Sequence, residues 1–430
     1  MKITVFGLWH LGMVTAACLA SVGHEVIGFE NNSEAIDRLK KGEMPIFEPG
    51  LEEMVSQSTA NGNLRFTSLP EKISEAEIIW VTFDTPVDDN DRADTDFVLR
   101  QMEGLLPYVS HDSLIMISSQ LPIGSTRYLI QLCNKKYGEK NISFSYSPEN
   151  LRLGKAIEVF TKPDRVIIGV QSEKDKPRIE KMLEKFTSNI IWMSIESAEM
   201  TKHALNAFLA TSVVFINELA TICEQVGADA KEVERGLKSE VRIGPRAYLS
   251  PGNAFAGGTL ARDIVYLINA GNKSKLETKL FSAVLDSNEA HKKWLCKRLS
   301  QILGNLSKKN IAILGLTYKA GTNTLRRSSA IELASWLSQQ NAQVFAYDPV
   351  IDQLPAELEK IITLKKTCQE VLKDMDALVI STEWQEFKEL TSNDLISLMK
   401  QPIIFDQNSF LEKTLGLDDE VTYISVGRVK

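Results

Sequence analysis

Short apolar runs alternate with longer, charged, helix-like stretches through the first part of the chain. The runs that we predict to be strands are residues 3–6, 25–29, 78–82, 114–118, 143–146 and 165–169. Segments such as 32–41 and 179–186 lie between them and have helical patterning. This alternation is typical of a parallel sheet covered by helices on both faces. We therefore expect a doubly wound domain over residues 1–193.

The pattern changes near residue 197. From there, apolar side chains recur at helical spacing for about thirty residues, up to Gly227. A helix of this length usually connects domains or builds a dimer interface. Further helical stretches follow at 264–270 and 276–302. We predict a central helical domain over residues 194–304.

The opening pattern then returns. Residues 310–314 form a strand that enters Gly315, residues 329–339 a helix, and residues 343–347 a strand that ends at Asp348. Later strands are expected at 378–381 and 403–405. The predicted fold class is therefore α/β, with two Rossmann-like doubly wound domains joined by a long central helix, the second domain covering 305–430.

A glycine-containing turn follows the first strand, where a dinucleotide fingerprint would lie. That fingerprint has three glycines, for the turn, for close approach of the pyrophosphate and for helix packing. The first and third are present as Gly7 and Gly12, but Trp9 occupies the second position. Glu30 ends the second strand, where an acid binds the ribose diol of NAD. These residues alone leave two readings open: a dinucleotide site, or a Rossmann-like domain that holds no nucleotide.

Composition narrows the class of protein. The chain has 430 residues, of which 43% are hydrophobic and 24% charged, as in ordinary globular proteins. The formal net charge of −7 argues against general nucleic-acid binding, which needs a basic surface. The five cysteines have no metal-ligand spacing and their odd number argues against a disulfide framework. We expect no metal site and a reducing, cytoplasmic environment.

An apolar run over residues 3–22 imitates a signal peptide. It is followed by a turn and a second strand that ends in an acid, which is the register of a Rossmann unit. We therefore assign it to the fold. No other long uncharged apolar run is present, so no membrane span is predicted.

Several ordered segments resemble a known family. They are EMPIFEPGLEEM (43–54), TPVDDNDRAD (85–94), SSQLPIGST (118–126), SPENLRLGKA (147–156), PDR (163–165), EMTKHALNAFLA (199–210), VRIGPRAYL (241–249), NAFAGGTLARD (253–263), LGLTYKAGTNTLRRSS (314–329), YDP (347–349) and TEWQEF (382–387). In this order and spacing the chain resembles the UDP-glucose/GDP-mannose dehydrogenase family over nearly its whole length.

The resemblance implies an NAD-binding domain, a helical dimerisation core and a second domain that helps to hold a UDP-sugar. It also implies oxidation of the sugar C6 alcohol to a carboxylate with two NAD. In that family a cysteine captures the aldehyde, because an aldehyde donates a hydride only after a nucleophile makes it tetrahedral. The partners implied are a UDP-sugar and a second copy of the chain, with no nucleic acid and no membrane.

The resemblance also implies the roles of individual residues. The catalytic positions are Lys202, which stabilises the C6 oxyanion, Asn206 one helical turn further on, Asp263, which orients water, and Thr259. The cofactor positions are Gly7, Leu11, Gly12, Glu30, Thr85, Gln120, Arg262 and Arg326. The substrate positions are Glu149, Asn150, Leu151, Arg152, Arg242 (expected to reach the partner's site), Tyr248, Gly257 and Lys319. Outside this context, we would interpret Lys202, Arg242 and Lys319 as ordinary solvated charges.

Four departures from the family pattern bear on the chemistry that the resemblance implies. The family motif GFGGSCFPKD aligns without gaps with residues 254–263, so Thr259 stands in place of the catalytic cysteine. Leu153 replaces a glutamate that handles the hydrolytic water, and Gln120 replaces a threonine. The motif DGRN is shortened to residues 406–408, DQN.

The cysteine and the glutamate, which serve the second oxidation in that family, are lost. The lysine, asparagine and aspartate, which the first oxidation also uses, are kept as Lys202, Asn206 and Asp263. Our leading hypothesis is an NAD-dependent oxidoreductase that resembles UDP-glucose 6-dehydrogenase, without the cysteine route and limited to a two-electron step or altered to oxidise a hydrated aldehyde. Two alternatives stay open: a nucleotide-sugar-binding protein without redox activity, which Trp9 favours, and an epimerase or isomerase that retains NAD.

Overall fold

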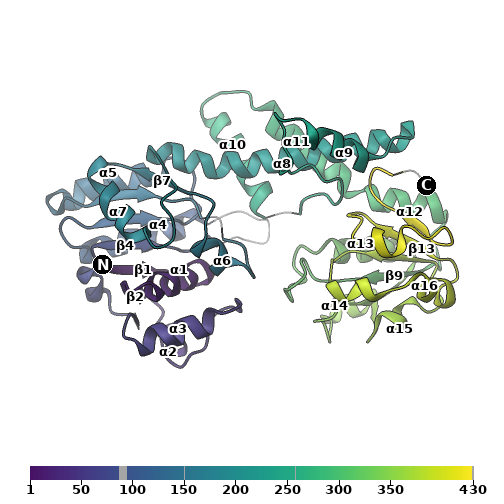
Figure 1. Cartoon of the computed structure of the whole chain (residues 1–430), viewed down its shortest axis with the longest axis horizontal. Helices are drawn as coiled ribbons and strands as arrows, with labels where there is room; N and C mark the ends of the chain where they lie inside the picture. The colour runs from purple at the N-terminus through teal and green to yellow at the C-terminus, as the bar shows by residue number, and fades with distance from the viewer. Residues whose placement is uncertain (87–93, 150, 257, 429–430) are drawn as a thin grey trace. The chain divides into compact units, whose positions relative to one another are not determined.

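The computed structural model describes residues 1–86, 94–149, 151–256 and 258–428 (Figure 1). The chain forms two compact units, Met1–Leu205 and Asn206–Lys430. Each unit is built around its own sheet, and the two are described separately below.

The first unit contains an eight-stranded sheet with the order β3-β2-β1-β4-β5-β6-β7-β8. All neighbouring strands are parallel except β6 and β7, which are antiparallel. The strands are β1 (Lys2–Phe6), β2 (Glu25–Phe29), β3 (Leu64–Thr67), β4 (Ile78–Val81), β5 (Leu114–Ile117), β6 (Ser143–Tyr146), β7 (Val166–Val170) and β8 (Ile190–Met193). Because β1, β2, β4, β5 and β6 run in the same direction, the loops that follow them meet at one edge of the sheet.

Helices cover both faces of this sheet. They are α1 (His10–Ser21), α2 (Ser33–Lys40), α3 (Leu51–Ala60), α4 (Thr95–Leu105), α5 (Ser125–Tyr137), α6 (Ala156–Thr161) and α7 (Lys176–Leu183). Successive side chains of a strand point to opposite faces, so Val5 packs in one hydrophobic cluster with α1 and α3, and Phe6 in another with α4 and α5. Helix α1 is buried over most of its surface, which explains why residues 10–21 carry no charge apart from His10.

The second unit contains a six-stranded, all-parallel sheet with the order β11-β10-β9-β12-β13-β14. The strands are β9 (Asn310–Leu314), β10 (Gln343–Tyr347), β11 (Ile362–Leu364), β12 (Ala377–Ile380), β13 (Ile403–Asp406) and β14 (Thr422–Ile424). The helices are α9 (Ala230–Ser239), α10 (Thr259–Lys273), α11 (Lys279–Lys292), α12 (Trp294–Leu303), α13 (Ser329–Gln339), α14 (Ala356–Glu359), α15 (Cys368–Leu372), α16 (Ser392–Leu398) and α17 (Glu412–Leu415).

Helix α8 (Ile195–Val226) is the long helix predicted from the apolar spacing, and it contributes residues to both units. Among the described residues it is the one helix long and apolar enough to cross a membrane by length and composition. One such helix is weak evidence for a membrane span, because long core helices pass the same test.

The predicted α/β fold class is confirmed, and most predicted elements lie within a residue or two of the observed ones. Four short strands were not predicted: β3, β8, β11 and β14. The single stretch predicted over 276–302 is two helices, α11 and α12, separated at Lys293. The three-part division at residues 193 and 304 stays a prediction.

Candidate active site

The glycine turn lies between β1 and α1. Gly7 has a left-handed φ of 97°, and a Cβ there would lie 2.9 Å from the Phe83 ring. A Cβ on Gly12 would lie 1.8 Å from the main-chain oxygen of Gly7. Both glycines are therefore required by contacts within the turn, as the dinucleotide fingerprint predicts. Leu11 is buried in the core, so only its main chain can face a phosphate.

Trp9 fits this turn without strain. Its φ of −89° is one that any residue adopts, and its side chain is 51% exposed. The backbone angle at this position therefore does not require glycine.

Glu30 lies after β2, beside the same turn. Its carboxylate accepts hydrogen bonds from the main-chain N–H groups of Leu8 (3.1 Å) and Asn31 (2.9 Å), and the residue is partly exposed. Each carboxylate oxygen retains a lone pair for further donors, such as ribose hydroxyls. The turn and Glu30 together fit the adenosine diphosphate part of NAD.

The corresponding acid of the second sheet has a different role. Asp348 is buried after β10, and its carboxylate accepts hydrogen bonds from the N–H groups of Leu316 (2.7 Å) and Thr317 (3.0 Å) and from the Trp384 indole (3.2 Å). Its acceptor capacity is spent on holding neighbouring loops. The first sheet, and not the second, therefore has the features of a dinucleotide site.

Two more predicted cofactor residues lie together at the ends of neighbouring strands. Thr85 follows β4 and Gln120 follows β5, and the Thr85 hydroxyl donates to the main-chain oxygen of Gln120 at 2.6 Å. They lie at the sheet edge where the loops after β1 and β2 also meet.

Lys202 is buried against the loop that follows β6. Its ammonium donates to the main-chain oxygen of Glu149 at 2.6 Å and contacts the Glu149 carboxylate at 3.2 Å. Leu151 packs against the core and Arg152 is exposed. An amine held in this position can donate a hydrogen bond to a developing oxyanion.

In the second unit, Asn206 and Asp263 form a buried pair. The Asn206 amide donates to the Asp263 carboxylate, and both residues are less than 10% exposed. Thr259 is the first residue of α10, one turn before Asp263, and is exposed. Arg262 lies on the same helix.

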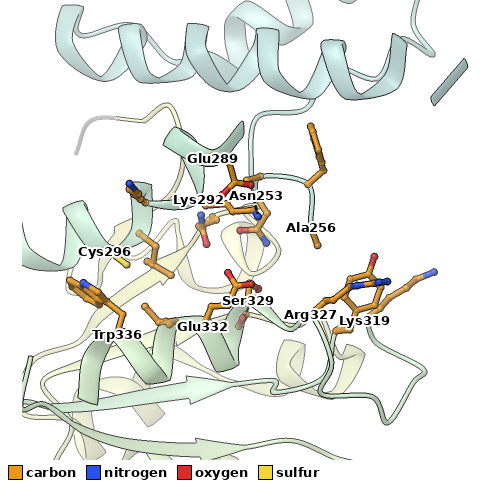
Figure 2. A pocket seen from close by; sticks show the side chains of 18 residues that line it. Asn253, Ala256, Glu289, Lys292, Cys296, Lys319, Arg327, Ser329, Glu332 and Trp336 are labelled. Atoms are coloured by element: carbon orange, nitrogen blue, oxygen red, sulfur yellow. Dashed lines mark hydrogen bonds and ion pairs between the residues drawn. The ribbon is translucent and has the colours of Figure 1, made fainter. Parts of the chain in front are cut away.

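A pocket of about 490 Å³ lies within the second unit (Figure 2). Its lining carries four cationic residues, Lys292, Lys293, Lys319 and Arg327, against two acidic ones, Glu289 and Glu332. Lys319 and Arg327 lie at one end, and Cys296 and Trp336 at the other (Figure 2). Burial raises the pKa of Cys296 to about 11, so its thiol stays protonated and is no nucleophile. This distribution of side chains fits a ligand with an anionic group at the Lys319 and Arg327 end and a planar base at the Trp336 end.

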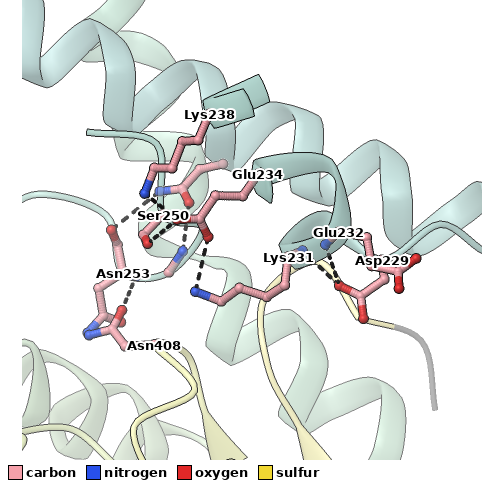
Figure 3. Close-up of polar contacts among 10 residues, drawn as sticks. Asp229, Lys231, Glu232, Glu234, Lys238, Ser250, Asn253 and Asn408 are labelled. Atoms are coloured by element: carbon pink, nitrogen blue, oxygen red, sulfur yellow. Dashed lines mark hydrogen bonds and ion pairs between the residues drawn. The ribbon is translucent and has the colours of Figure 1, made fainter. Parts of the chain in front are cut away.

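The wall of the pocket formed by residues 253–256 is held from several sides. Asn288 pairs with both main-chain groups of Phe255 (3.0 and 2.8 Å), and the Asn408 side chain accepts from the Asn253 N–H at 2.7 Å (Figure 3). His291 bonds to the Gly252 oxygen at 2.8 Å. These bonds fix the wall before a ligand binds.

The segment that precedes this wall is tied to α9 through Ser250. Ser250 donates to the Glu234 carboxylate at 2.8 Å, and Lys238 contacts the same oxygen at 2.6 Å (Figure 3). Burial alone would raise the pKa of Glu234, but these partners hold it below its ordinary value. Glu234 therefore stays charged at neutral pH and anchors the loop.

The other predicted substrate and cofactor residues do not lie in one cluster. Arg242 and Tyr248 project from the loop after α9, and the Arg242 side chain is 85% exposed and paired with Glu240. Arg326 is exposed just before α13. Asn150, Gly257 and most of the segment 85–94 lie outside the described residues.

Sequence reasoning missed two groups of residues. Arg327, Lys292 and Trp336 line the pocket, and His10 and Glu48 meet beside the glycine turn. The sequence shows Arg327 beside Arg326, and it shows Glu48 within the segment FEPG. Only the tertiary contacts show which residues these side chains meet. Among the described residues, no three His, Cys, Asp or Glu lie close enough together to hold a metal ion.

Comparison with known families agrees with this geometry. Three models of the UDP-glucose/GDP-mannose dehydrogenase family match: the NAD binding domain over residues 1–187, the central domain over 196–290 and the UDP binding domain over 312–413. The UDP binding domain model covers one side of the pocket, including Lys319 and Arg327.

Individual relatives are similar to this protein over the whole length of the chain. UDP-glucose 6-dehydrogenase YwqF of Bacillus subtilis is 33% identical over 431 residues, with 100% of this chain and 98% of the relative covered. UDP-glucose 6-dehydrogenase of Rickettsia typhi is 33% identical, with 99% of each chain covered. The solved UDP-glucose dehydrogenase of Pyrobaculum islandicum has a TM-score of 0.83 and 26% identity, with 100% and 98% covered.

The fold and the glycine turn define a two-domain oxidoreductase with a nicotinamide cofactor. The chain belongs to the UDP-glucose/GDP-mannose dehydrogenase family of NAD-dependent nucleotide-sugar dehydrogenases, which act on CH–OH donors. The predicted cofactor, NAD, is confirmed, and so is the prediction that the chain is an enzyme.

Proposed function

We propose that this enzyme oxidises the C6 alcohol of a UDP-sugar to the aldehyde with one NAD and does not continue to the carboxylate. The observation that carries this proposal is Thr259 at the start of α10, four residues before the buried Asp263, where the family motif has its cysteine. The relatives named UDP-glucose 6-dehydrogenase make UDP-glucose the first substrate to test.

The binding residues follow from the pocket of the second unit. Lys319 and Arg327 provide positive charge for a diphosphate, and the Trp336 end accommodates the base. Residues 253–256 form a pre-organised wall beside them. In this proposal Tyr248 and Gly257 contact the sugar side, and Arg242 reaches the site of a partner subunit.

The first oxidation needs a stabilised oxyanion and a hydride acceptor. NAD supplies the acceptor when it is bound at the turn formed by Gly7, Leu11 and Gly12, with Glu30, Thr85, Gln120, Arg262 and Arg326 as further contacts. Lys202 stabilises the oxygen at C6 as the hydride leaves, because its charge is already desolvated and fixed by Glu149. Asn206 and Asp263 hold the water molecule that takes up the proton of the C6 hydroxyl as the hydride passes to NAD.

The second oxidation needs a tetrahedral adduct of the aldehyde. The hydroxyl of Thr259 is protonated at neutral pH, and among the described residues no base is hydrogen-bonded to it, so it is a poor nucleophile. Leu153, 38% exposed, cannot handle water as a carboxylate would. Oxidation of a hydrated aldehyde would be the remaining route to the carboxylate.

We further propose that the enzyme is a homodimer in the cytoplasm. Phe208, Phe215 and Ile222 on α8 are each at least 50% exposed and recur every seven residues, which places them on one face of the helix. A stripe of this kind is unfavourable in water and is suited to a second copy of the same helix. NAD and UDP-sugars are both cytoplasmic metabolites.

Product analysis tests the proposal. Purified enzyme is incubated with NAD and a panel of UDP- and GDP-sugars, and hydroxylamine traps any aldehyde for mass spectrometry. The proposal predicts an oxime of the UDP-sugar aldehyde and little uronate. Uronate as the main product would contradict the two-electron limit, and an epimer with no net NADH would favour the alternative that retains its cofactor.

A further inference from the structure

Glu48 is a buried carboxylate in the loop between α2 and α3, and three donors from two different segments meet on it. It is 4% exposed. One oxygen accepts from the main-chain N–H of Ala156 at 2.8 Å. The other accepts from the N–H of Gly154 at 2.8 Å and contacts His10 Nε2 at 3.0 Å.

The first of these segments is the cofactor turn. His10 is the first residue of α1 and lies between Trp9 and Gly12. Its side chain is 15% exposed, so its position depends on the Glu48 contact more than on solvent. A ligand bound at the start of α1 would contact the main chain that carries His10.

The second segment is the loop proposed to bind the sugar. Gly154 and Ala156 form its end, where α6 begins. Its beginning, at Glu149, is fixed by the Lys202 ammonium. The exposed Arg152 and Leu153 lie between these two anchors.

Capping of α6 explains only part of this arrangement. Bonds from the N–H groups of Gly154 and Ala156 would satisfy the start of that helix without any histidine. The His10 contact is the additional feature, and it joins the cap to the turn. Because a buried carboxylate that loses a donor is destabilised, a displacement of either segment is opposed through Glu48.

We propose that Glu48 is a positioning residue that couples the cofactor turn to the sugar loop, so that NAD bound at the turn orders residues 151–156. The inference rests on the proposed function in one respect, namely that this loop contacts the sugar. It deepens that function by predicting that NAD and the UDP-sugar bind with positive cooperativity, and that this cooperativity passes through His10 and Glu48.

Amide hydrogen exchange tests the coupling without any turnover. The Gly154 and Ala156 amides are followed with and without saturating NAD, in the wild-type protein and in the His10→Phe variant, which keeps a ring but removes the contact. We expect NAD to slow exchange of these two amides at least threefold in the wild type and by less than 1.5-fold in His10→Phe. His111→Phe is the matched control, since His111 is exposed before β5, at the opposite edge of the sheet.

A second readout measures the cooperativity itself. The Kd of NAD is determined with and without UDP-glucose, and the ratio is compared among wild type, His10→Phe, Glu48→Gln and the double variant. We expect a ratio of at least three in the wild type and near one in all three variants, with no further loss in the double variant. If Glu48→Gln fails to fold, His10→Phe alone still decides the question.

The outcomes separate the two proposals. NAD binding that leaves exchange at Gly154 and Ala156 unchanged overturns the coupling and leaves the proposed function standing. Equal protection in the wild type and in His10→Phe also overturns the coupling. A protein that binds no NAD overturns both.

Discussion

The Lys202 ammonium lies 2.6 Å from the main-chain oxygen of Glu149, and the two residues are 53 positions apart in the sequence. The contact joins the first turns of α8 to the loop after β6. This loop at the edge of the sheet therefore fixes the position of the ammonium that we propose stabilises the oxyanion. The lysine is buried, and the Glu149 carboxylate contacts its ammonium at 3.2 Å as well.

Loss of this charge should reduce turnover strongly. We expect Lys202→Met to lower kcat by about 100- to 1000-fold with a much smaller change in the KM for the UDP-sugar, because the charge acts mainly in the transition state. Steady-state kinetics on UDP-glucose measure both constants. Lys135→Met, at an exposed position of α5, is the control and should behave as the wild type. A fall in kcat of less than tenfold for Lys202→Met would rule out the proposed role.

The glycine turn allows a matched pair of substitutions. A Cβ at Gly12 would lie 1.8 Å from the Gly7 oxygen, and that atom belongs to the backbone and cannot rotate away. We expect Gly12→Ala to destabilise the protein by a few kcal/mol, on the order of the largest single-residue effects, and to abolish NAD binding. At Gly104 in α4, a Cβ would meet no heavy atom within 4 Å.

Gly104→Ala should therefore stabilise the protein by about 0.5–1 kcal/mol, because alanine is the better helix former. Urea denaturation and NAD titration measure both variants. Normal NAD affinity in Gly12→Ala would show that the turn does not hold the cofactor.

Stability should depend on pH through His291. Burial holds the pKa of His291 below its ordinary value of 6.5, although its hydrogen bond to the Gly252 oxygen opposes this. The unfolded chain therefore binds this proton at higher pH than the folded protein. The contribution is fully present above about pH 6.5 and is lost as the pH falls towards the lowered folded value.

The His291→Gln variant, which retains a donor for Gly252, tests this pH dependence. Between pH 7.5 and 5 its free energy of unfolding should fall less steeply than that of the wild type. Burial also lowers the pKa of His24, which stays in both proteins and supplies the same background slope. Identical slopes in the two proteins would contradict the assignment.

The apolar stripe of α8 predicts the oligomeric state. We expect the wild type to be a dimer by light scattering at micromolar concentration, and Phe215→Glu to dissociate it, because a carboxylate would be buried without a partner. Thr221→Glu adds the same charge on another face of α8 and should leave the dimer intact. A wild-type monomer would contradict this part of the proposal.

Much of the fold could be predicted because hydrophobic period and strand termini are local properties. The predictions for β2 and β10 match the observed bounds, since each is an apolar run that ends in an acid. The missed strand β3 has the sequence LRFT, with an exposed arginine in its middle, and so lacks a continuous apolar run. Its place in the sheet comes from pairing with β2, which no local pattern encodes.

Part of the candidate site could likewise be predicted from the sequence, and part could not. Gly7, Gly12 and Glu30 could be predicted because a known motif fixes their spacing. Glu48 could not, because its partners are 38 to 108 residues away and its function depends on contacts that only the folded chain creates. The effect of Trp9 on the approach of a pyrophosphate stays a prediction, because its φ of −89° shows only that the backbone does not need glycine there.

The central claim is that Thr259 limits the enzyme to a two-electron oxidation, and the most direct test is the number of NADH formed per UDP-glucose consumed. NADH absorbance and chromatography of the sugar nucleotides give both quantities in the same reaction, run to completion with excess NAD. We predict a ratio of one for the wild type, with the aldehyde as product, and a rise towards two for Thr259→Cys. A ratio of two for the wild type, with uronate as product, would contradict the claim.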